Sequence, residues 1–237
     1  DEGFTDYSST RAMAMLRNSP GFWYNGSYGG YYRLARSGYE EPASTHADHF
    51  NTNFASTSSA YSKGAVFIEQ LGYIVGADTR DKILRDYFNT WKFKHPNPND
   101  FIRVAEKVSG VELDWYKEYW IYSTKTIDYA VGDIAMVDNK TSITIKRIGK
   151  MPMPIDVLVT YKDGTEEMHY MPLNIMYGAK TAETKAPTTV HPAWKWTHPE
   201  YAFTTSRVIS DIKSIEIDPS QRLADINKTN NKLVIPD

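Results

Sequence analysis

The stretch SSAYSKGAVFIEQLGYIVG, residues 58–76, carries the clearest helical pattern in the chain. Its apolar residues recur at the spacing of three and four positions that places side chains on one side of a helix. They are Val66, Ile68, Leu71, Ile74 and Val75. Gly76 follows directly and can end a helix, because glycine adopts the backbone conformation common after a last turn. The pattern therefore predicts a helix from Ser58 to Val75.

Helical patterns continue on both sides of this stretch. One pattern runs from Asp6 to Arg17, and the glycine-rich segment after it is expected to be a loop that enters a second helix near Tyr31. Three later apolar patterns each follow an aspartate that can cap a helix. These aspartates are Asp78, Asp100 and Asp114. The first half of the chain is therefore predicted to be helical.

The apolar pattern changes after Tyr129. Four later segments alternate or are rich in β-branched residues, as strands are. They are residues 142–148, 154–161, 165–173 and 214–219. The pair Asp163-Gly164 predicts a tight hairpin between two of them, and the polar tail is expected to end in an edge strand. We therefore expect an α+β chain, with a mainly helical part over residues 1–130 and an all-β sandwich over residues 131–237.

The composition excludes several classes of function. With 27 basic and 29 acidic residues the formal net charge is −2, so the chain lacks the basic character that nucleic acids or anionic membranes attract. No apolar run is long enough to predict a membrane-spanning segment. The absence of cysteine excludes disulfides, thiolate zinc sites and cysteine nucleophiles. The compartment stays open, with an exported or periplasmic location favoured over a cytoplasmic one, and so does the oligomeric state.

Histidine and serine patterns indicate little chemistry. His46 and His49 have a spacing that could pair two imidazoles on one metal ion, with Glu41 and Asp48 nearby. The segment reads as a loop, however, and no third ligand stands at a definite spacing. No serine-nucleophile elbow occurs, and the glycine-rich segment follows no strand, as a phosphate-binding loop would require.

Two short motifs carry a more specific signal. The chain contains DEGFTDY at residues 1–7 and YSKG at residues 61–64. In this order, and with this separation, they resemble the M1 family of zinc aminopeptidases, the gluzincin type. The helical segment 84–120 is similar to the helices that close the catalytic domain of that family. The resemblance covers about residues 1–130 and is weak over the β part.

The resemblance implies roles for two residues. Glu2 matches the glutamate that binds the catalytic zinc as its third protein ligand, about 20 residues after the HExxH helix. Tyr61 matches the tyrosine whose hydroxyl donates a hydrogen bond to the oxyanion of the tetrahedral intermediate. The implied fold is the C-terminal half of a thermolysin-like catalytic domain followed by a β-sandwich. The implied activity is hydrolysis of peptides by zinc-activated water.

The chain also departs from the family pattern. It contains neither HExxH nor the GxMEN motif that binds the substrate amine, so two zinc ligands and the general base are missing. We therefore expect a fragment of a peptidase that is inactive by itself, with zinc bound in the full-length parent. The alternative is a non-catalytic module that binds peptides or glycans, a scaffold, or a pseudoenzyme.

Ordinary structural roles compete with the catalytic ones. An acid such as Glu2 suits the first turn of a helix because of the helix dipole, and Tyr61 could be a buried aromatic residue. The motif order favours the catalytic roles for both. Gly64 is expected to allow close helix packing and Lys63 to find a charge partner. Asp1 and Asp6 are expected to cap the helix or support the ligand.

Overall fold

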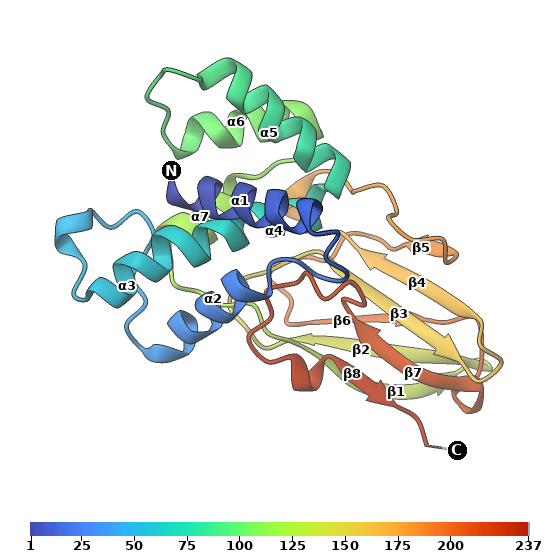
Figure 1. Cartoon of the computed structure of the whole chain (residues 1–237). Coiled ribbons are helices and arrows are strands. Elements are labelled where there is room, and N and C mark those ends of the chain that lie inside the picture. Colours follow the sequence, from blue (N-terminus) through green and yellow to red (C-terminus); the bar gives the residue numbers. More distant parts are fainter. Residues whose placement is uncertain (237) are drawn as a thin grey trace. The chain divides into compact units, whose positions relative to one another are not determined.

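Helices make up the first half of the chain and strands the second half in the computed structural model (Figure 1), which describes residues 1–236. The expected α+β class is confirmed. One compact unit comprises Asp1–Lys125, and a second begins at Thr126. The division lies five residues before the expected one, because residues 126–130 already pair within the β unit. Among the described residues, no helix is long and apolar enough to cross a membrane.

The helical unit is built around one continuous helical run. Helix α3, a π-helical turn and helix α4 follow one another without a break and together extend the helix predicted from residue 58. Every residue of α4 from Ala65 to Val75 is buried. The elements of this unit are α1 (Glu2–Leu16), α2 (Asn25–Ser37), α3 (Asn53–Ser58), the π turn (Ser59–Lys63), α4 (Gly64–Val75), α5 (Ala77–Trp91), α6 (Pro98–Ser109) and α7 (Asp114–Tyr122).

Two predictions about the first helices were wrong. Helix α1 begins at Glu2 rather than near Asp6. The glycine-rich segment is not a loop, since Gly26, Gly29 and Gly30 all lie within α2. The reason lies in packing at Gly30, where a Cβ atom would come within 2.2 Å of the Ser62 side chain. A small residue is needed there because the two helical segments approach closely.

The starts of the later helices differ in detail from the expected caps. Asn97, not Asp100, caps α6, and the two residues form a reciprocal capping box in which each side chain accepts a backbone N–H of the other. Asp78 lies in the first turn of α5, after Gly76 in the cap position. Helix α7 begins at Asp114, as predicted.

The β unit contains a three-stranded and a five-stranded sheet. The strand order is β1-β2-β6 in the first sheet and β5-β4-β3-β7-β8 in the second. Asp163 and Gly164 form the predicted hairpin between β3 and β4, and β8 is the predicted edge strand. The strands are β1 (Tyr129–Val137), β2 (Lys140–Arg147), β3 (Ile155–Tyr161), β4 (Glu166–Met171), β5 (Thr188–Val190), β6 (Glu200–Thr204), β7 (Ile212–Ile217) and β8 (Lys232–Val234).

The core of this unit is formed by alternate residues of the strands, whose side chains point to one face of each sheet. In β3, Ile155, Val157 and Val159 are buried while the residues between them are partly exposed. The two sheets meet at His169 of β4 and Phe203 of β6, whose ring centroids lie 4.5 Å apart. One face of each sheet therefore supplies the core, and the other face of the larger sheet is left for further contacts.

Candidate functional site

Glu2 lies in the first turn of α1 with a half-buried side chain. Asp1 occupies the cap position, but its side chain makes no capping hydrogen bond. Within residues 1–236, the Glu2 carboxylate makes no hydrogen bond or ion pair. A negative charge is favourable at this end of a helix. The carboxylate is therefore held in place by its backbone and remains open to an external partner.

Two glycines bring the DEGF and YSKG motifs together. A Cβ atom on Gly3 would lie 2.7 Å from the Gly64 Cα, and one on Gly64 would lie 2.8 Å from the Gly3 Cα. Helix α1 and the start of α4 thus touch through their backbones. The expected role of Gly64 in close helix packing is confirmed. The residue after Glu2 and a residue one turn after Tyr61 are direct neighbours in space.

Tyr61 lies in the π turn, in the middle of a helical run that begins at Asn53, before the predicted start at Ser58. It is 46% exposed, and in the described part of the chain its hydroxyl has no hydrogen-bond partner. A buried packing role is therefore excluded in this structure. Single π turns within α-helices are frequent at functional sites, because the extra residue re-orients the side chains around it.

Lys63, the last residue of the π turn, connects this turn to two other segments of the helical unit. Its Nζ atom donates to Glu40 Oε1 at 2.8 Å and to the backbone carbonyl of Ser123 at 3.2 Å. The side chains of Lys63 and Glu40 are only 4% and 7% exposed. The expected charge partner of Lys63 is thus Glu40, and this buried pair ties the turn to the end of α2 and the end of α7.

A cavity of about 370 Å³ opens beside Glu2. Its wall is mainly aromatic and aliphatic. The lining comprises Asp1, Glu2, Gly3, Phe4, Ala43, Ser59, Ala60, Gly64, Phe67, Ile68, Tyr87, Pro96, Asn97, Pro98, Phe101, Ile102 and Ile121. Ala60 belongs to it, while Tyr61 does not. The buried Ser59 hydroxyl has no partner among the described atoms. The cavity can accept an apolar group next to a carboxylate.

A buried ion-pair network behind α4 was not predicted. Arg80 Nη1 donates to Glu69 at 2.6 Å, and both Arg80 and Arg11 donate to Asp81. Burial alone would raise the pKa of Asp81, but its hydrogen bonds to the two arginines hold that pKa below its ordinary value. Gly72 leaves room for Arg80, since a Cβ there would lie 2.7 Å from Nη1. The signal in the sequence was Glu69, the one charged residue among the buried residues 65–75 of α4.

The histidine pair gains no support as a metal site. His46 and His49 are exposed, and the His46 Nδ1 atom accepts the backbone N–H of Asp48 at 3.3 Å. No carboxylate or imidazole in the described range joins them in a cluster of three possible ligands. The two histidines form part of a short 3-10 helix, Ala47–His49, with His46 at its N-cap.

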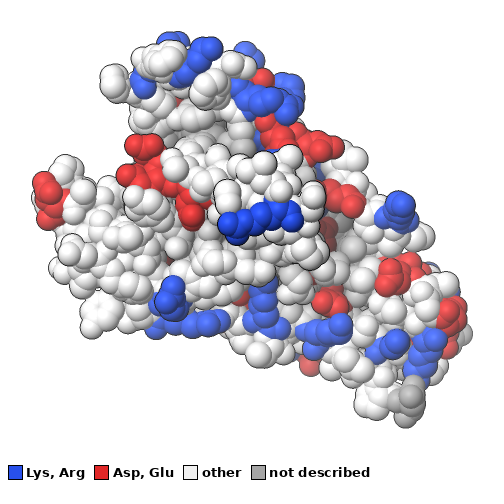
Figure 2. Space-filling model, in the orientation of Figure 1, with Lys and Arg blue, Asp and Glu red and all other residues white. Residues whose placement is uncertain are grey.

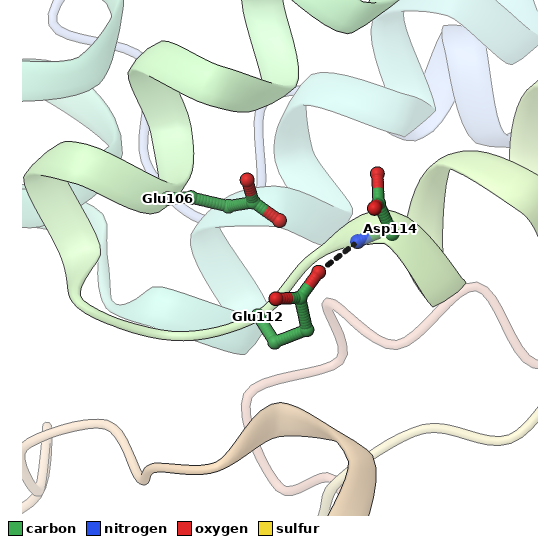
Figure 3. A group of neighbouring side chains, drawn as sticks. All are labelled: Glu106, Glu112 and Asp114. Atoms are coloured by element: carbon green, nitrogen blue, oxygen red, sulfur yellow. Dashed lines mark hydrogen bonds between the residues drawn. The ribbon is translucent and has the colours of Figure 1, made fainter.

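Three carboxylates gather at the junction of α6 and α7 (Figure 3). Ligand atoms of Glu106, Glu112 and Asp114 all lie within 4.8 Å of one another, so the group could hold a metal ion. Glu106 accepts the backbone N–H of Leu113 at 2.9 Å, and Glu112 accepts that of Asp114 at 3.2 Å. Burial raises the pKa of Glu106. Glu106 and Glu112 thus also have a structural role, since each accepts a backbone N–H at the start of α7. Glu2 does not belong to this group.

Charges on the face drawn in Figure 2 are mixed. Basic and acidic side chains both occur there, with broad uncharged areas between them. This agrees with the near-neutral formal charge of the sequence.

The fold is similar to that of a known peptidase. No model of a protein family matches the sequence, and no curated protein matches it. Among solved structures, the crystal structure of Legionella pneumophila aminopeptidase A in complex with aspartic acid matches with a TM-score of 0.57 and 15% sequence identity. The match covers 94% of this chain and 23% of that one. The chain thus shares the fold of a portion of an aminopeptidase and spans less than a quarter of its length.

Proposed function

We propose that this chain is part of a zinc-dependent peptidase of the M1 gluzincin type that releases residues from the N-terminus of peptides. The observation that carries this proposal is the contact between Gly3 and Gly64, which places the DEGF and YSKG segments side by side. The similarity in fold to a portion of an aminopeptidase supports it. The site residues are Glu2 and Tyr61.

The two side chains suit different tasks. Glu2 is a zinc ligand in this proposal, and its carboxylate is open to an external partner. The Tyr61 hydroxyl donates a hydrogen bond to the negatively charged oxygen that develops on the substrate carbonyl. A donor aimed at developing charge stabilises the transition state more than the bound substrate. The exposure of Tyr61 leaves its hydroxyl accessible for this task.

Zinc does not fit this chain alone. A catalytic zinc takes three protein ligands, whereas no other histidine, aspartate or glutamate of the described residues forms a three-ligand group with Glu2. In this proposal the two further ligands and the general base come from a segment that this chain does not contain. We expect the chain alone to bind zinc weakly and to hydrolyse no peptide.

The test uses a protein that contains an HExxH segment about 18 residues before Glu2. In it, Tyr61→Phe should lower kcat by about 100-fold or more, with KM, zinc content and melting temperature nearly unchanged. Tyr39→Phe is the matched control, because Tyr39 is also exposed, at 60%, and lies outside the proposed site. A fully active Tyr61→Phe enzyme would refute the role of the hydroxyl.

Glu2 is tested by metal content. Glu2→Gln should reduce the zinc bound per protein molecule, measured by atomic absorption, and added zinc should restore part of the lost activity. Unchanged zinc content would exclude Glu2 as a ligand. If the gene encodes no HExxH segment before Glu2, the non-catalytic binding module becomes the better explanation.

A further inference from the structure

The β unit contains a second cavity, unrelated to the proposed peptidase site. It has a volume of about 430 Å³, within the range of small-molecule pockets. The strand register shows how its floor forms, because Leu158 pairs with Met168, and Met168 with Thr188. Paired residues share one face of a sheet. The floor is thus the outer, largely apolar face of β3, β4 and β5, opposite to the face that builds the core.

Ion pairs connect the segments that line the rest of this cavity, residues 180–185 and 219–222, with each other and with β3. Lys180 Nζ lies 2.6 Å from Asp156 of β3 and 3.4 Å from Glu183. Arg222, which follows β7, lies 2.5 Å from Glu183. The side chain of Lys180 is 4% exposed and that of Arg222 is 14% exposed. These two positive and two negative charges neutralise one another, so this group of four residues adds no net charge to the lining.

Two further charged residues of the lining behave differently. Glu166 and Lys185 are both exposed. Over residues 1–236, neither side chain makes an ion pair or a hydrogen bond. Glu166 shares the outer face with Met168, since strand residues two apart point to the same side. The cavity therefore presents one unpaired negative and one unpaired positive group above an apolar floor.

We propose that this cavity binds a short zwitterionic peptide of apolar residues, such as a dipeptide. Its free ammonium group pairs with Glu166 and its carboxylate with Lys185, while its side chains contact Leu158, Met168 and Val190. The volume suits such a ligand, and in the described lining Glu166 and Lys185 are the charged residues without an ion-pair partner. The inference is independent of the proposed peptidase function, since it concerns a different site.

The experiment is a calorimetric titration of the whole chain with three probes: leucyl-leucine, N-acetyl-leucyl-leucine and leucyl-leucine amide. The chain should bind leucyl-leucine more tightly than either blocked form. Glu166→Gln should weaken binding of leucyl-leucine by about 2- to 5-fold, as expected for an exposed ion pair, and leave the acetylated probe unaffected. Lys185→Met should weaken leucyl-leucine similarly and leave the amide unaffected.

A steric variant completes the test. Leu158→Arg fills the cavity floor and should abolish binding, whereas Met136→Arg, at a half-exposed position of β1 outside the lining, should not. Equal affinity for all three probes would overturn the charge pairing. Binding to folded Leu158→Arg, or no binding of leucyl-leucine to the unmodified chain, would overturn the site. If Leu158→Arg does not fold, the two charge variants decide.

Discussion

At the scale of single residues, burial decides how much the loss of one partner of an ion pair lowers the stability of the fold. Lys63 and Glu40 form an ion pair with side chains only 4% and 7% exposed. Lys82 and Asp86 form one of similar length on the surface of α5, with side chains 57% and 42% exposed. Removing one partner of a buried pair leaves the other charge without solvent or counter-charge, while an exposed partner is simply hydrated.

Lys63→Met should therefore lower the free energy of unfolding of the helical unit by about 3 to 5 kcal/mol. Lys82→Met is the matched control and should cost less than about 1 kcal/mol. Urea denaturation followed by tryptophan fluorescence measures both values. Equal effects of the two substitutions would show that the buried pair is not formed in solution.

His169 and His191 make a residue-scale contact with consequences for pH dependence. His169 Nδ1 lies 2.9 Å from His191 Nε2, and Glu167 lies 3.4 Å from the other His169 nitrogen. Burial, and then the neighbouring His191, lowers the pKa of His169 to about 4, and burial lowers that of His191. The unfolded chain then binds more protons than the folded chain between about pH 4 and the ordinary histidine pKa of about 6.5.

The stability contributed by His169 should thus be complete above about pH 6.5 and be lost as the pH falls toward 4. Asp218 and Asp225 oppose this trend, since burial raises the pKa of each to about 6. The test is therefore a difference between variants. Between pH 7 and pH 5, His169→Phe should lose less stability than the unmodified chain by about 1 to 2 kcal/mol.

Exposed His198 provides the control for this pH effect. His198→Gln should follow the unmodified chain at every pH, as measured by urea midpoints at pH 7, 6 and 5. If His169→Phe also follows the unmodified chain between pH 7 and pH 5, His169 does not remain neutral in the folded β unit.

At the scale of elements, two helical glycines differ in the space around them, so replacing them by alanine should change the stability in opposite directions. Gly64 touches the backbone of α1, and a Cβ atom there would lie 2.8 Å from the Gly3 Cα. Gly29 lies exposed inside α2, and a Cβ atom there would meet nothing within 4 Å. A backbone cannot move aside as a flexible side chain can, whereas an open helical glycine only raises the entropy of the unfolded chain.

Gly64→Ala should therefore destabilise the helical unit by about 1 to 3 kcal/mol by forcing α1 and α4 apart. Gly29→Ala should stabilise it by about 0.5 to 1 kcal/mol. Thermal unfolding monitored by circular dichroism at 222 nm separates the two signs. A neutral Gly64→Ala would mean that α1 does not contact α4 as closely as described, and the proposed site would lose its geometric basis.

The same comparison shows what the sequence could predict. The helix ending at Val75, the Asp163-Gly164 hairpin and the last edge strand follow from local patterns, and the structure confirms them. The helical state of Gly30 and the pairing of Glu69 with Arg80 depend on contacts between separate helices. Local patterns do not contain that information. Of the candidate site, the motifs name Glu2 and Tyr61, but the cavity beside Glu2 appears only in the fold.

At the scale of the whole molecule, residues 126–130 belong with the strands that follow them. Met151 donates its backbone N–H to the Thr126 carbonyl at 3.1 Å, and Ile127 forms an isolated bridge with Asp225. Tyr129 is completely buried, and its hydroxyl hydrogen-bonds the backbone of Met153. These contacts all lie inside the β unit, and they place the start of that unit at Thr126.

A chain that starts at Thr126 should therefore fold by itself, with a cooperative urea transition and a near-ultraviolet circular dichroism signal. A chain that starts at Gly132 lacks Ile127 and Tyr129, both 0% exposed. Their loss should cost more than about 4 kcal/mol, comparable to the total stability of a small domain. The shorter chain should lose the near-ultraviolet signal and bind a hydrophobic dye, because part of its core is exposed. Equal urea midpoints for the two chains would show that residues 126–131 only connect the two units, and the division would then lie after residue 131.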